Sequence, residues 1–333
     1  PFISSIIIVS KQFGNGGILM GKRFRHFVFL TTASVAGLHA INKVINYTAS
    51  LKNLTSSYSG NYYKWRYGNI FFTKHGNGQP LLLIHDLDPS SSSYEWTRMI
   101  KKLEKNHTVY TVDLPGCGHS DKPEMIYSNY LFVQFLHDFV KDVIKETPSV
   151  AATGSSGSFT IMCNKMYAGL FDKVIIINPE DLKSLTVSPD TRTDILKKVI
   201  DCPIIGTFIY NVWMHERHFN EIFENKYYYK KSLVSSKFED IYFESAHIGN
   251  GRGRYLLASK LAHYTNISIA HALKGMDNLC LIGSRNYVGS IQTINQYLIY
   301  NSGIETAYLS NAAYLPQLEV PDKLADLIAM FLE

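Results

Sequence analysis

The chain has 333 residues, of which 46% are hydrophobic and 18% are charged. This balance excludes intrinsic disorder, collagen and coiled coil, and it supplies enough apolar material for one large domain with an insertion or for two modest domains. The formal net charge of +5 at pH 7 is spread along the sequence without a long run of like charge. A nucleic-acid-binding surface needs clustered basic residues, so we expect no nucleic-acid partner.

A basic patch precedes an apolar stretch near the N-terminus. Lys22, Arg23 and Arg25 are followed by residues 27–45, which hold few charges. This order is typical of a signal peptide or a membrane anchor, and the stretch approaches the roughly 20 residues of a spanning helix. Its polar side chains equally fit an amphipathic helix that lies on a cytoplasmic domain. We therefore predict a hydrophobic helix or anchor within residues 20–52, after an upstream or disordered segment at residues 1–19.

Strands and helices alternate from residue 62 onwards. Residues 62–73 alternate aromatic and polar side chains around Gly68-Asn69, which indicates a β-hairpin. Residues 81–84 form a short apolar run bounded by turn residues, as expected of a strand that is buried on both faces. Further strands are expected at 107–112, 150–153, 174–177, 278–282 and 305–309, and helices at 96–103, 130–145, 159–170, 290–300 and 321–332. This rhythm predicts an α/β fold with a mostly parallel sheet and flanking helices.

The alternation stops after Asn178-Pro179 and resumes about a hundred residues later. Residues 180–275 are mostly helical in pattern and rich in aromatic residues, including the run Tyr227-Tyr228-Tyr229. The predicted sheet domain therefore comprises residues 62–179 and 276–333, with a helical insertion between them. The aromatic side chains of the insertion either line a pocket for a small organic ligand or pack the insertion onto the sheet.

Three polar motifs directly follow predicted strands. They are His85-Asp86-Leu87-Asp88, the run Asp113-Leu114-Pro115-Gly116-Cys117-Gly118-His119-Ser120, and Thr153-Gly154-Ser155-Ser156-Gly157-Ser158. The carboxyl ends of parallel strands are where open α/β sheets bind ligands. We therefore expect the functional site at this edge of the sheet.

The order and spacing of these motifs resemble the α/β-hydrolase family over about residues 62–333. The resemblance implies an α/β-hydrolase fold, a nucleophile elbow at the third motif, and a cap domain in the insertion at 180–275. Short stretches at 92–96 and 120–123 are also similar to haloalkane dehalogenases. Dehalogenase chemistry needs an Asp at the nucleophile position, and the elbow has none, so we do not expect that reaction.

The elbow motif can place one of two serines at the nucleophile position. A tight turn between strand and helix needs small neighbours, and Gly154-x-Ser156-x-Ser158 supplies them around Ser156. The alternative frame, from Thr153 to Gly157, makes Ser155 the nucleophile. A third interpretation is that the Gly/Ser-rich sequence only permits a bend.

The oxyanion hole follows from the choice of Ser156. The N–H of the next residue, Gly157, would be one donor, and the N–H of Asp86 or Leu87 would be the second. The family commonly has Gly directly after the His, and this chain has Asp86 there. Its charge opposes the stabilisation of an oxyanion.

The other two members of a catalytic triad are absent at the expected positions. Tyr314 stands where the family has its catalytic His, and a phenol with a reference pKa near ~10 is a poor base at neutral pH. The acid position holds Asn286, and Glu180 is an alternative acid after an earlier strand. We expect Tyr314 to lie within reach of Ser156, because the sequence around both positions keeps the family spacing.

Two functions remain open from the sequence. One is a serine hydrolase with an atypical triad that acts on a small apolar ester or amide. The other is a catalytically inactive pseudo-hydrolase that binds a small apolar ligand or a protein. The four cysteines include no CxxC pair, so we expect neither a metal nor another cofactor. The oligomeric state does not follow from the sequence.

Overall fold

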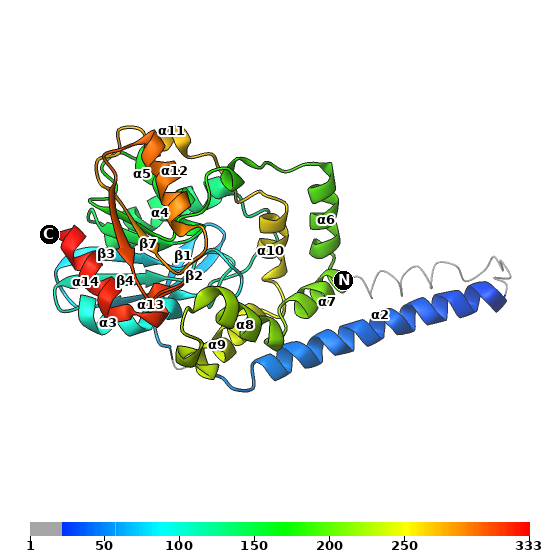
Figure 1. The fold of residues 1–333 in the computed structure, drawn as a ribbon. Helices are drawn as coiled ribbons and strands as arrows, with labels where there is room; N and C mark the ends of the chain where they lie inside the picture. Colours follow the sequence, from blue (N-terminus) through cyan, green and yellow to red (C-terminus); the bar gives the residue numbers. More distant parts are fainter. Residues whose placement is uncertain (1–21, 57) are drawn as a thin grey trace. The chain divides into compact units, whose positions relative to one another are not determined.

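The computed structural model describes residues 22–56 and 58–333, so the expectation for residues 1–19 lies outside the described part of the chain. The chain divides after Ile41 into two compact units, and the second, Asn42–Glu333, contains the whole sheet. Eight strands form one sheet in the order β1-β2-β4-β3-β5-β6-β7-β8 (Figure 1). Their bounds are Asn61–Trp65, Gly68–His75, Gln79–Ile84, His107–Val112, Ser149–Thr153, Val174–Ile177, Leu279–Ser284 and Glu305–Leu309, for β1 to β8.

The sheet is parallel except at the edge formed by the N-terminal hairpin. β1 and β2 pair antiparallel with Trp65 opposite Gly68, which confirms the predicted hairpin. β2 also runs antiparallel to β4, while all the pairs from β4 to β8 are parallel. The parallel strands place their carboxyl ends at one edge, where the three polar motifs meet.

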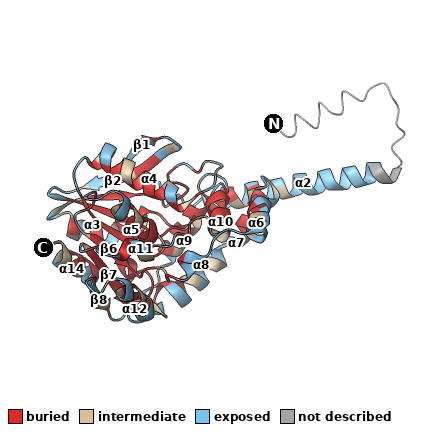
Figure 2. Cartoon of the chain, turned by 90° about the horizontal axis from the view of Figure 1, so that it is seen from above, coloured by how far each residue is buried: buried red, intermediate tan, exposed pale blue. Residues whose placement is uncertain are grey.

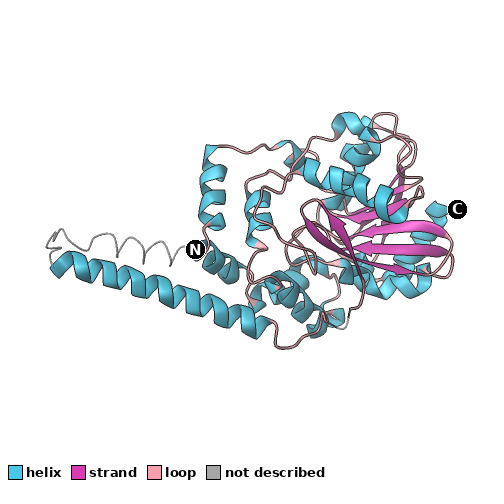
Figure 3. Ribbon diagram, turned by 180° about the vertical axis from the view of Figure 1, so that it is seen from behind, coloured by secondary structure: helices cyan, strands magenta, loops and turns pink. Residues whose placement is uncertain are grey.

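Helices cover both faces of the sheet (Figure 3). Successive residues of β3 point to opposite sides, so Leu82 joins the core under α4 and α5 while Leu83 joins the core under α3 and α14. Both side chains are fully buried. The continuous apolar run therefore reflects burial on two faces, as predicted. The flanking helices are α3 (Thr97–Leu103), α4 (Asn129–Phe139), α5 (Ser156–Met166), α12 (Ser290–Tyr300), α13 (Pro316–Glu319) and α14 (Pro321–Leu332).

The chain between β6 and β7 is helical, as the sequence predicts. It contains α6 (Thr191–Asp201), α7 (Ile205–Trp213), α8 (Glu216–Ile222), α9 (Ser236–His247), α10 (Arg254–Leu261) and α11 (Ala270–Leu273). Tyr227 and Tyr228 are buried in an aromatic cluster that also contains Tyr242 and Tyr314, whereas Tyr229 is half exposed. Two of the three consecutive tyrosines therefore pack the insertion against the loop that follows β8.

The hydrophobic helix near the N-terminus is α2 (Lys22–Ala49). Its stretch Arg25–Ala49 is long and apolar enough to cross a membrane, and it is the one helix in the described part of the chain that is. Most of its side chains from residue 25 onwards are exposed (Figure 2). α2 is a candidate span by its length and composition only, and a signal sequence near the N-terminus meets the same two criteria.

Candidate active site

The turn after β5 changes direction most sharply at Gly154. β5 ends at Thr153 and α5 begins at Ser156, so two residues make the turn. Gly154 has a φ of +56°, while Ser155 already has the right-handed helical φ of −61°. In a nucleophile elbow the strained apex residue presents its side chain above the sheet. The apex in this chain is therefore Gly154, which has no side chain to present, and it lies two residues before Ser156.

Ser156 and Gly157, the expected nucleophile and oxyanion donor, lie within the first turn of α5. Ser156 is fully buried, and its Oγ donates to the carbonyl oxygen of His85 at 2.6 Å. The N–H of Gly157 donates to the carbonyl oxygen of Gly154 at 3.0 Å. A Cβ at Gly157 would collide with Ile176 of β6, so glycine is needed there for close packing of helix and sheet. These contacts correct the expected geometry, because the hydroxyl and the amide are both held in local structure.

The Asp86 carboxylate lies between the loop after β3 and the start of α5. Its side chain is buried, and Oδ1 accepts hydrogen bonds from the N–H groups of Leu87 and Ser155, both at 2.9 Å. These are the two positions from which an elbow builds its oxyanion hole, namely the residue after the apex and the loop after the earlier strand. Leu87 is thus at the site, as expected. Its N–H and that of Ser155 are bonded to a carboxylate that the chain itself supplies.

Tyr314 closes the site from the opposite side. Its hydroxyl donates to Asp86 Oδ2 at 2.8 Å, and its side chain is buried. Burial, reinforced by the negative charges of Asp86 and Glu180, raises the pKa of the phenol well above its usual range, so Tyr314 is a neutral donor. A Cβ at Gly154 would overlap the Tyr314 hydroxyl and would lie 2.7 Å from Asp86 Oδ1. The Tyr314 hydroxyl thus lies beside Gly154 and bonds to Asp86, while the expected reach to Ser156 stays a prediction.

A second buried carboxyl group lies behind Asp86. Glu95 accepts hydrogen bonds from the Tyr242 hydroxyl at 2.7 Å and from Gln317 Nε2 at 3.1 Å. The backbone N–H of Asp86 also donates to Glu95 Oε2, at 3.4 Å. Burial and, next, the negative charge of Asp86 raise the pKa of Glu95 to about 8. Glu95 is therefore mostly protonated at neutral pH, which limits the number of like charges in this space.

The alternative nucleophile Ser155 and the two candidate acid positions, Glu180 and Asn286, form two separate hydrogen bonds. The Ser155 hydroxyl donates to Glu180 Oε2 at 3.1 Å, and both side chains are partly exposed. Asn286 is exposed, and its Oδ1 accepts the N–H of Asn311 at 2.9 Å. The structure thus brings the alternative serine together with the alternative acid. Asn286 instead shapes the loop in front of α12.

Asn178, which no sequence motif singled out, positions the loop that carries Tyr314. It is buried after β6 with a φ of +45°. Its Nδ2 donates to the carbonyl oxygens of Ala313 at 3.1 Å and Tyr314 at 2.9 Å, and its Oδ1 accepts the N–H of Ser284 at 2.8 Å. One carboxamide therefore ties the ends of β6 and β7 to the loop after β8. Its only signal in the sequence is an Asn-Pro pair directly after a predicted strand.

His85 has a structural set of hydrogen bonds. Its Nδ1 lies 2.7 Å from the Asp86 carbonyl oxygen, and its Nε2 accepts the N–H of Leu114 at 3.0 Å. Burial lowers the pKa of the imidazole, which favours the neutral ring that these two bonds require. Within residues 22–56 and 58–333, no group of three or more His, Cys, Asp or Glu is arranged to hold a metal ion.

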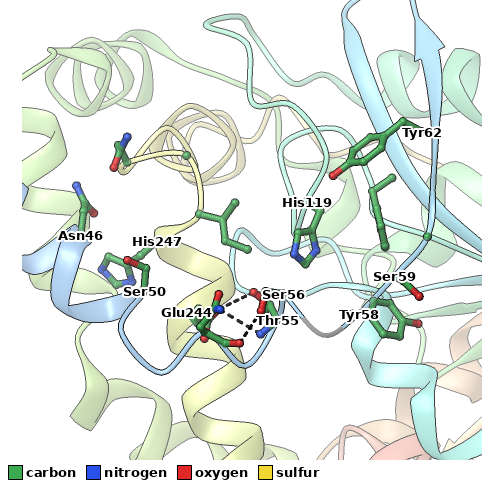
Figure 4. Close-up of a pocket in the computed structure, with 16 residues that line it drawn as sticks. Asn46, Ser50, Thr55, Ser56, Tyr58, Ser59, Tyr62, His119, Glu244 and His247 are labelled. Carbon is green, nitrogen blue, oxygen red and sulfur yellow. Dashed lines mark hydrogen bonds between the residues drawn. The ribbon is translucent and has the colours of Figure 1, made fainter.

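A cavity of about 560 Å³ opens between the segment after α2, the N-terminal hairpin and α9 (Figure 4). The rings of Tyr58 and Phe71 and the side chain of His119 line it, and none of the elbow residues does. The Glu244 carboxylate from α9 accepts two hydrogen bonds from Thr55, one from the backbone N–H at 3.1 Å and one from the side-chain hydroxyl at 2.5 Å. This pair fastens the segment after α2 to α9 and forms one wall of the cavity.

The fold and the elbow turn together define the class of protein. A family model described as "Alpha/beta hydrolase family" matches residues 75–326. This match covers most of the chain, and the chain belongs to the α/β-hydrolase family. The resemblance predicted from the three strand-end motifs is confirmed.

Curated relatives match shorter segments. The 2-hydroxy-6-oxo-6-(2'-aminophenyl)hexa-2,4-dienoic acid hydrolase of Metapseudomonas resinovorans is 27% identical over 113 residues, which is 34% of this chain and 36% of the relative. The haloalkane dehalogenase of Agrobacterium fabrum is 36% identical over 59 residues, or 18% of this chain and 19% of the relative. The matched segments thus span 36% or less of these relatives' length.

Solved structures match the fold over a much larger share of the chain. A serine hydrolase involved in carbazole degradation has a TM-score of 0.67 at 14% identity, and the match covers 82% of this chain and 98% of that protein. A membrane phospholipase A, described as a bacterial virulence factor, has a TM-score of 0.63 at 17% identity, with 94% and 98% covered. At these identities the likeness concerns the fold alone.

Proposed function

We propose that this protein is a noncatalytic member of the α/β-hydrolase family that acts by binding. The observation that carries the proposal is the Asp86 carboxylate, which accepts the N–H groups of Leu87 and Ser155 at the apex of the elbow. Acyl transfer requires these donors to be free for negative charge that develops on the substrate. A resident carboxylate both occupies the donors and repels that charge.

The apex residue supports the same conclusion. Gly154 offers no nucleophile, and a side chain there would collide with Tyr314 and Asp86. Tyr314, at the position of the family's catalytic His, is a buried neutral donor and cannot accept a proton from a serine at neutral pH. The nucleophile position thus lacks a side chain, and the groups at the positions of the base and the oxyanion hole bond to one another through Asp86.

A serine hydrolase that acts on a small apolar ester or amide is the second candidate. It is favoured by the 3.1 Å hydrogen bond between the Ser155 hydroxyl and Glu180, both of which are partly exposed. In this candidate Ser155 is the nucleophile, because Ser156 is fully buried. A carboxylate is a weak base for a serine hydroxyl, since the reference pKa of Glu lies near ~4.3.

Labelling with a fluorophosphonate probe separates the two candidates. We expect no labelling of the wild-type protein and no change in Ser155→Ala or Ser156→Ala. The triple variant Gly154→Ser, Asp86→Gly, Tyr314→His supplies a nucleophile and a base and frees the N–H donors. It is expected to gain labelling. Labelling of the wild-type protein that is lost in Ser155→Ala would establish the hydrolase instead, whatever the triple variant does.

A small, largely apolar ligand would bind in the cavity of Figure 4 under this proposal. Its volume of about 560 Å³ lies in the range typical of small-molecule sites, and the Tyr58 and Phe71 rings supply apolar surface. We expect native mass spectrometry of the purified protein to show a bound small molecule. Ser50→Phe, which places a ring at the cavity wall, is expected to remove it. The same bound mass in both proteins would contradict this assignment.

Association with a membrane through α2 is the last part of the proposal. The apolar stretch Arg25–Ala49 supports it. We expect the full chain to float with phospholipid vesicles in a density gradient. Recovery of the full chain in the soluble fraction without detergent would count against an anchor.

A further inference from the structure

Helix α7 buries its polar residues and exposes its apolar ones. Thr207, Tyr210 and Asn211 face inward, whereas Ile205 and Trp213 are 49% and 48% exposed. The outward positions recur at helical spacing and include the half-buried Phe208 and Ile209 and the exposed Val212. α7 has no charged side chain. A helix on a water-facing surface shows the opposite pattern, with its apolar stripe turned to the core.

The neighbouring helix α6 shows part of this pattern: it buries a lysine and exposes three apolar side chains, while Ile200 is buried and Lys198 is exposed. Its buried residues are Lys197 and Ile200, and Lys197 forms an ion pair with Asp201 at 2.5 Å within the helix. Its exposed apolar residues are Ile195, Leu196 and Val199, with exposed fractions of 58%, 43% and 44%. α6 and α7 pack together, and Gly206 allows the close approach, because a Cβ there would overlap the carbonyl oxygen of Ile200.

The end of α2 that belongs to the sheet-containing unit has the same character and contacts α7. Asn42 is buried, and its Nδ2 donates to the Ile204 carbonyl oxygen at 3.0 Å while its Oδ1 accepts Asn211 Nδ2 at 3.0 Å. Val44 and Tyr47 are 61% and 68% exposed. The sheet-containing unit therefore begins, at Asn42, in contact with α7.

We propose that the exposed apolar face of α6 and α7 is a membrane-contacting surface, which we name the α6–α7 face. It consists of Ile195, Leu196, Val199, Ile205, Val212 and Trp213. The inference rests on the proposed membrane role of α2, because Asn42, the first residue of the sheet-containing unit, is hydrogen-bonded to Asn211 of α7. The occupant is the outer, interfacial layer of a phospholipid bilayer, where Trp prefers to lie and where an apolar helix face is solvated by acyl chains.

Tryptophan fluorescence of the full chain on vesicles tests this surface. The chain has three tryptophans, and Trp65 and Trp96 are buried, so Trp213 is the one that is exposed. The helix α2 contains no tryptophan. In phosphatidylcholine vesicles with brominated acyl chains we expect quenching that is absent with ordinary lipid. Trp213→Phe is expected to lose that quenching.

Two further variants separate the α6–α7 face from the anchor. Ile195→Glu combined with Val199→Glu is expected to reduce quenching of Trp213 while flotation through α2 is retained. The matched control, Ile299→Glu on α12, changes a residue that is 81% exposed and far from α6 in sequence, and it should leave quenching unchanged. Circular dichroism verifies that each variant is folded.

Three outcomes overturn the inference. Flotation without bromolipid quenching means that α2 anchors the chain and the α6–α7 face does not touch lipid. Equal quenching in the wild type and Trp213→Phe means that the signal comes from elsewhere. Absence of flotation overturns the anchor and this inference together, and a dimer that Val212→Glu dissociates would then assign the face to a second copy of the chain.

Discussion

The elbow turn around Gly154 buries polar groups that are hydrogen-bonded to one another, whereas the α6–α7 face exposes apolar side chains to solvent. At the elbow, Asp86 is buried and receives three hydrogen bonds, from Leu87, Ser155 and Tyr314. On α6 and α7, apolar side chains are exposed, and no residue within 22–56 or 58–333 covers them. The buried polar groups of the elbow find their hydrogen-bond partners within the protein. An exposed apolar face is instead stabilised by contact with an apolar partner or a membrane. The comparison supports the two proposals made above, namely that the elbow is noncatalytic and that the α6–α7 face contacts lipid.

Removal of the Asp86 carboxylate is expected to have the largest effect on stability. Asp86→Ala leaves the Tyr314 hydroxyl and two N–H groups buried without an acceptor, and each lost partner costs about 1–3 kcal/mol. We expect the free energy of unfolding in urea to fall by about 3 kcal/mol or more. Asp86→Asn, which keeps acceptor oxygen at the site, should cost less. A loss below about 1 kcal/mol in Asp86→Ala would show that the elbow does not depend on this carboxylate.

A side chain at the apex is expected to have the next largest effect. Gly154→Ala adds a Cβ at a φ of +56°, in the space of the Tyr314 hydroxyl. Strain and overlap together should lower the free energy of unfolding by about 2–3 kcal/mol. Tyr314→Phe removes the hydroxyl that collides, so the double variant should lose less than the sum of the single losses. Strict additivity in this double-mutant cycle would argue that the apex and Tyr314 do not touch.

The pH dependence of stability reports on Glu95. Its pKa is about 8 in the folded protein and near 4.5 in the unfolded chain, so the folded state binds an extra proton between these values. This contribution is complete below about pH 4.5 and declines as the pH rises through 8, with a slope of up to ~1.4 kcal/mol per pH unit. We expect Glu95→Gln to flatten the decline between pH 5 and 8 in urea unfolding. Glu146→Gln, at an exposed loop position, is the control and should keep the wild-type slope.

The smallest effect is expected on the α6–α7 face. Val212→Ser exchanges a side chain that is 54% exposed, so the free energy of unfolding in water should change by less than about 0.5 kcal/mol. A loss above 1 kcal/mol would mean that Val212 packs within the protein, and it would weaken the contrast between the two regions.

Much of the fold could be predicted from local patterns. The hairpin has alternating aromatic and polar residues, the buried parallel strands are short apolar runs, and the insertion is helical in pattern; the structure contains all three. The strand-end motifs also indicated which edge carries the site and that Tyr314 would reach it. What the motif could not decide was the frame of the elbow, because Gly154, Ser155 and Ser156 are all small enough for a tight turn. Only the backbone dihedral angles distinguish the apex from the helix that follows.

The class of fold and the absence of a His at the triad position follow from the amino-acid sequence alone, because hydrophobic periodicity and motif spacing are local properties of the chain. That Asp86 accepts the N–H groups of Leu87 and Ser155, and that α6 and α7 expose apolar side chains, is visible only in the folded structure. Both findings depend on contacts between residues far apart in the chain, such as Asp86 with Tyr314 and Asn42 with Asn211. Such contacts exist only once the elements have packed, so no local pattern records them.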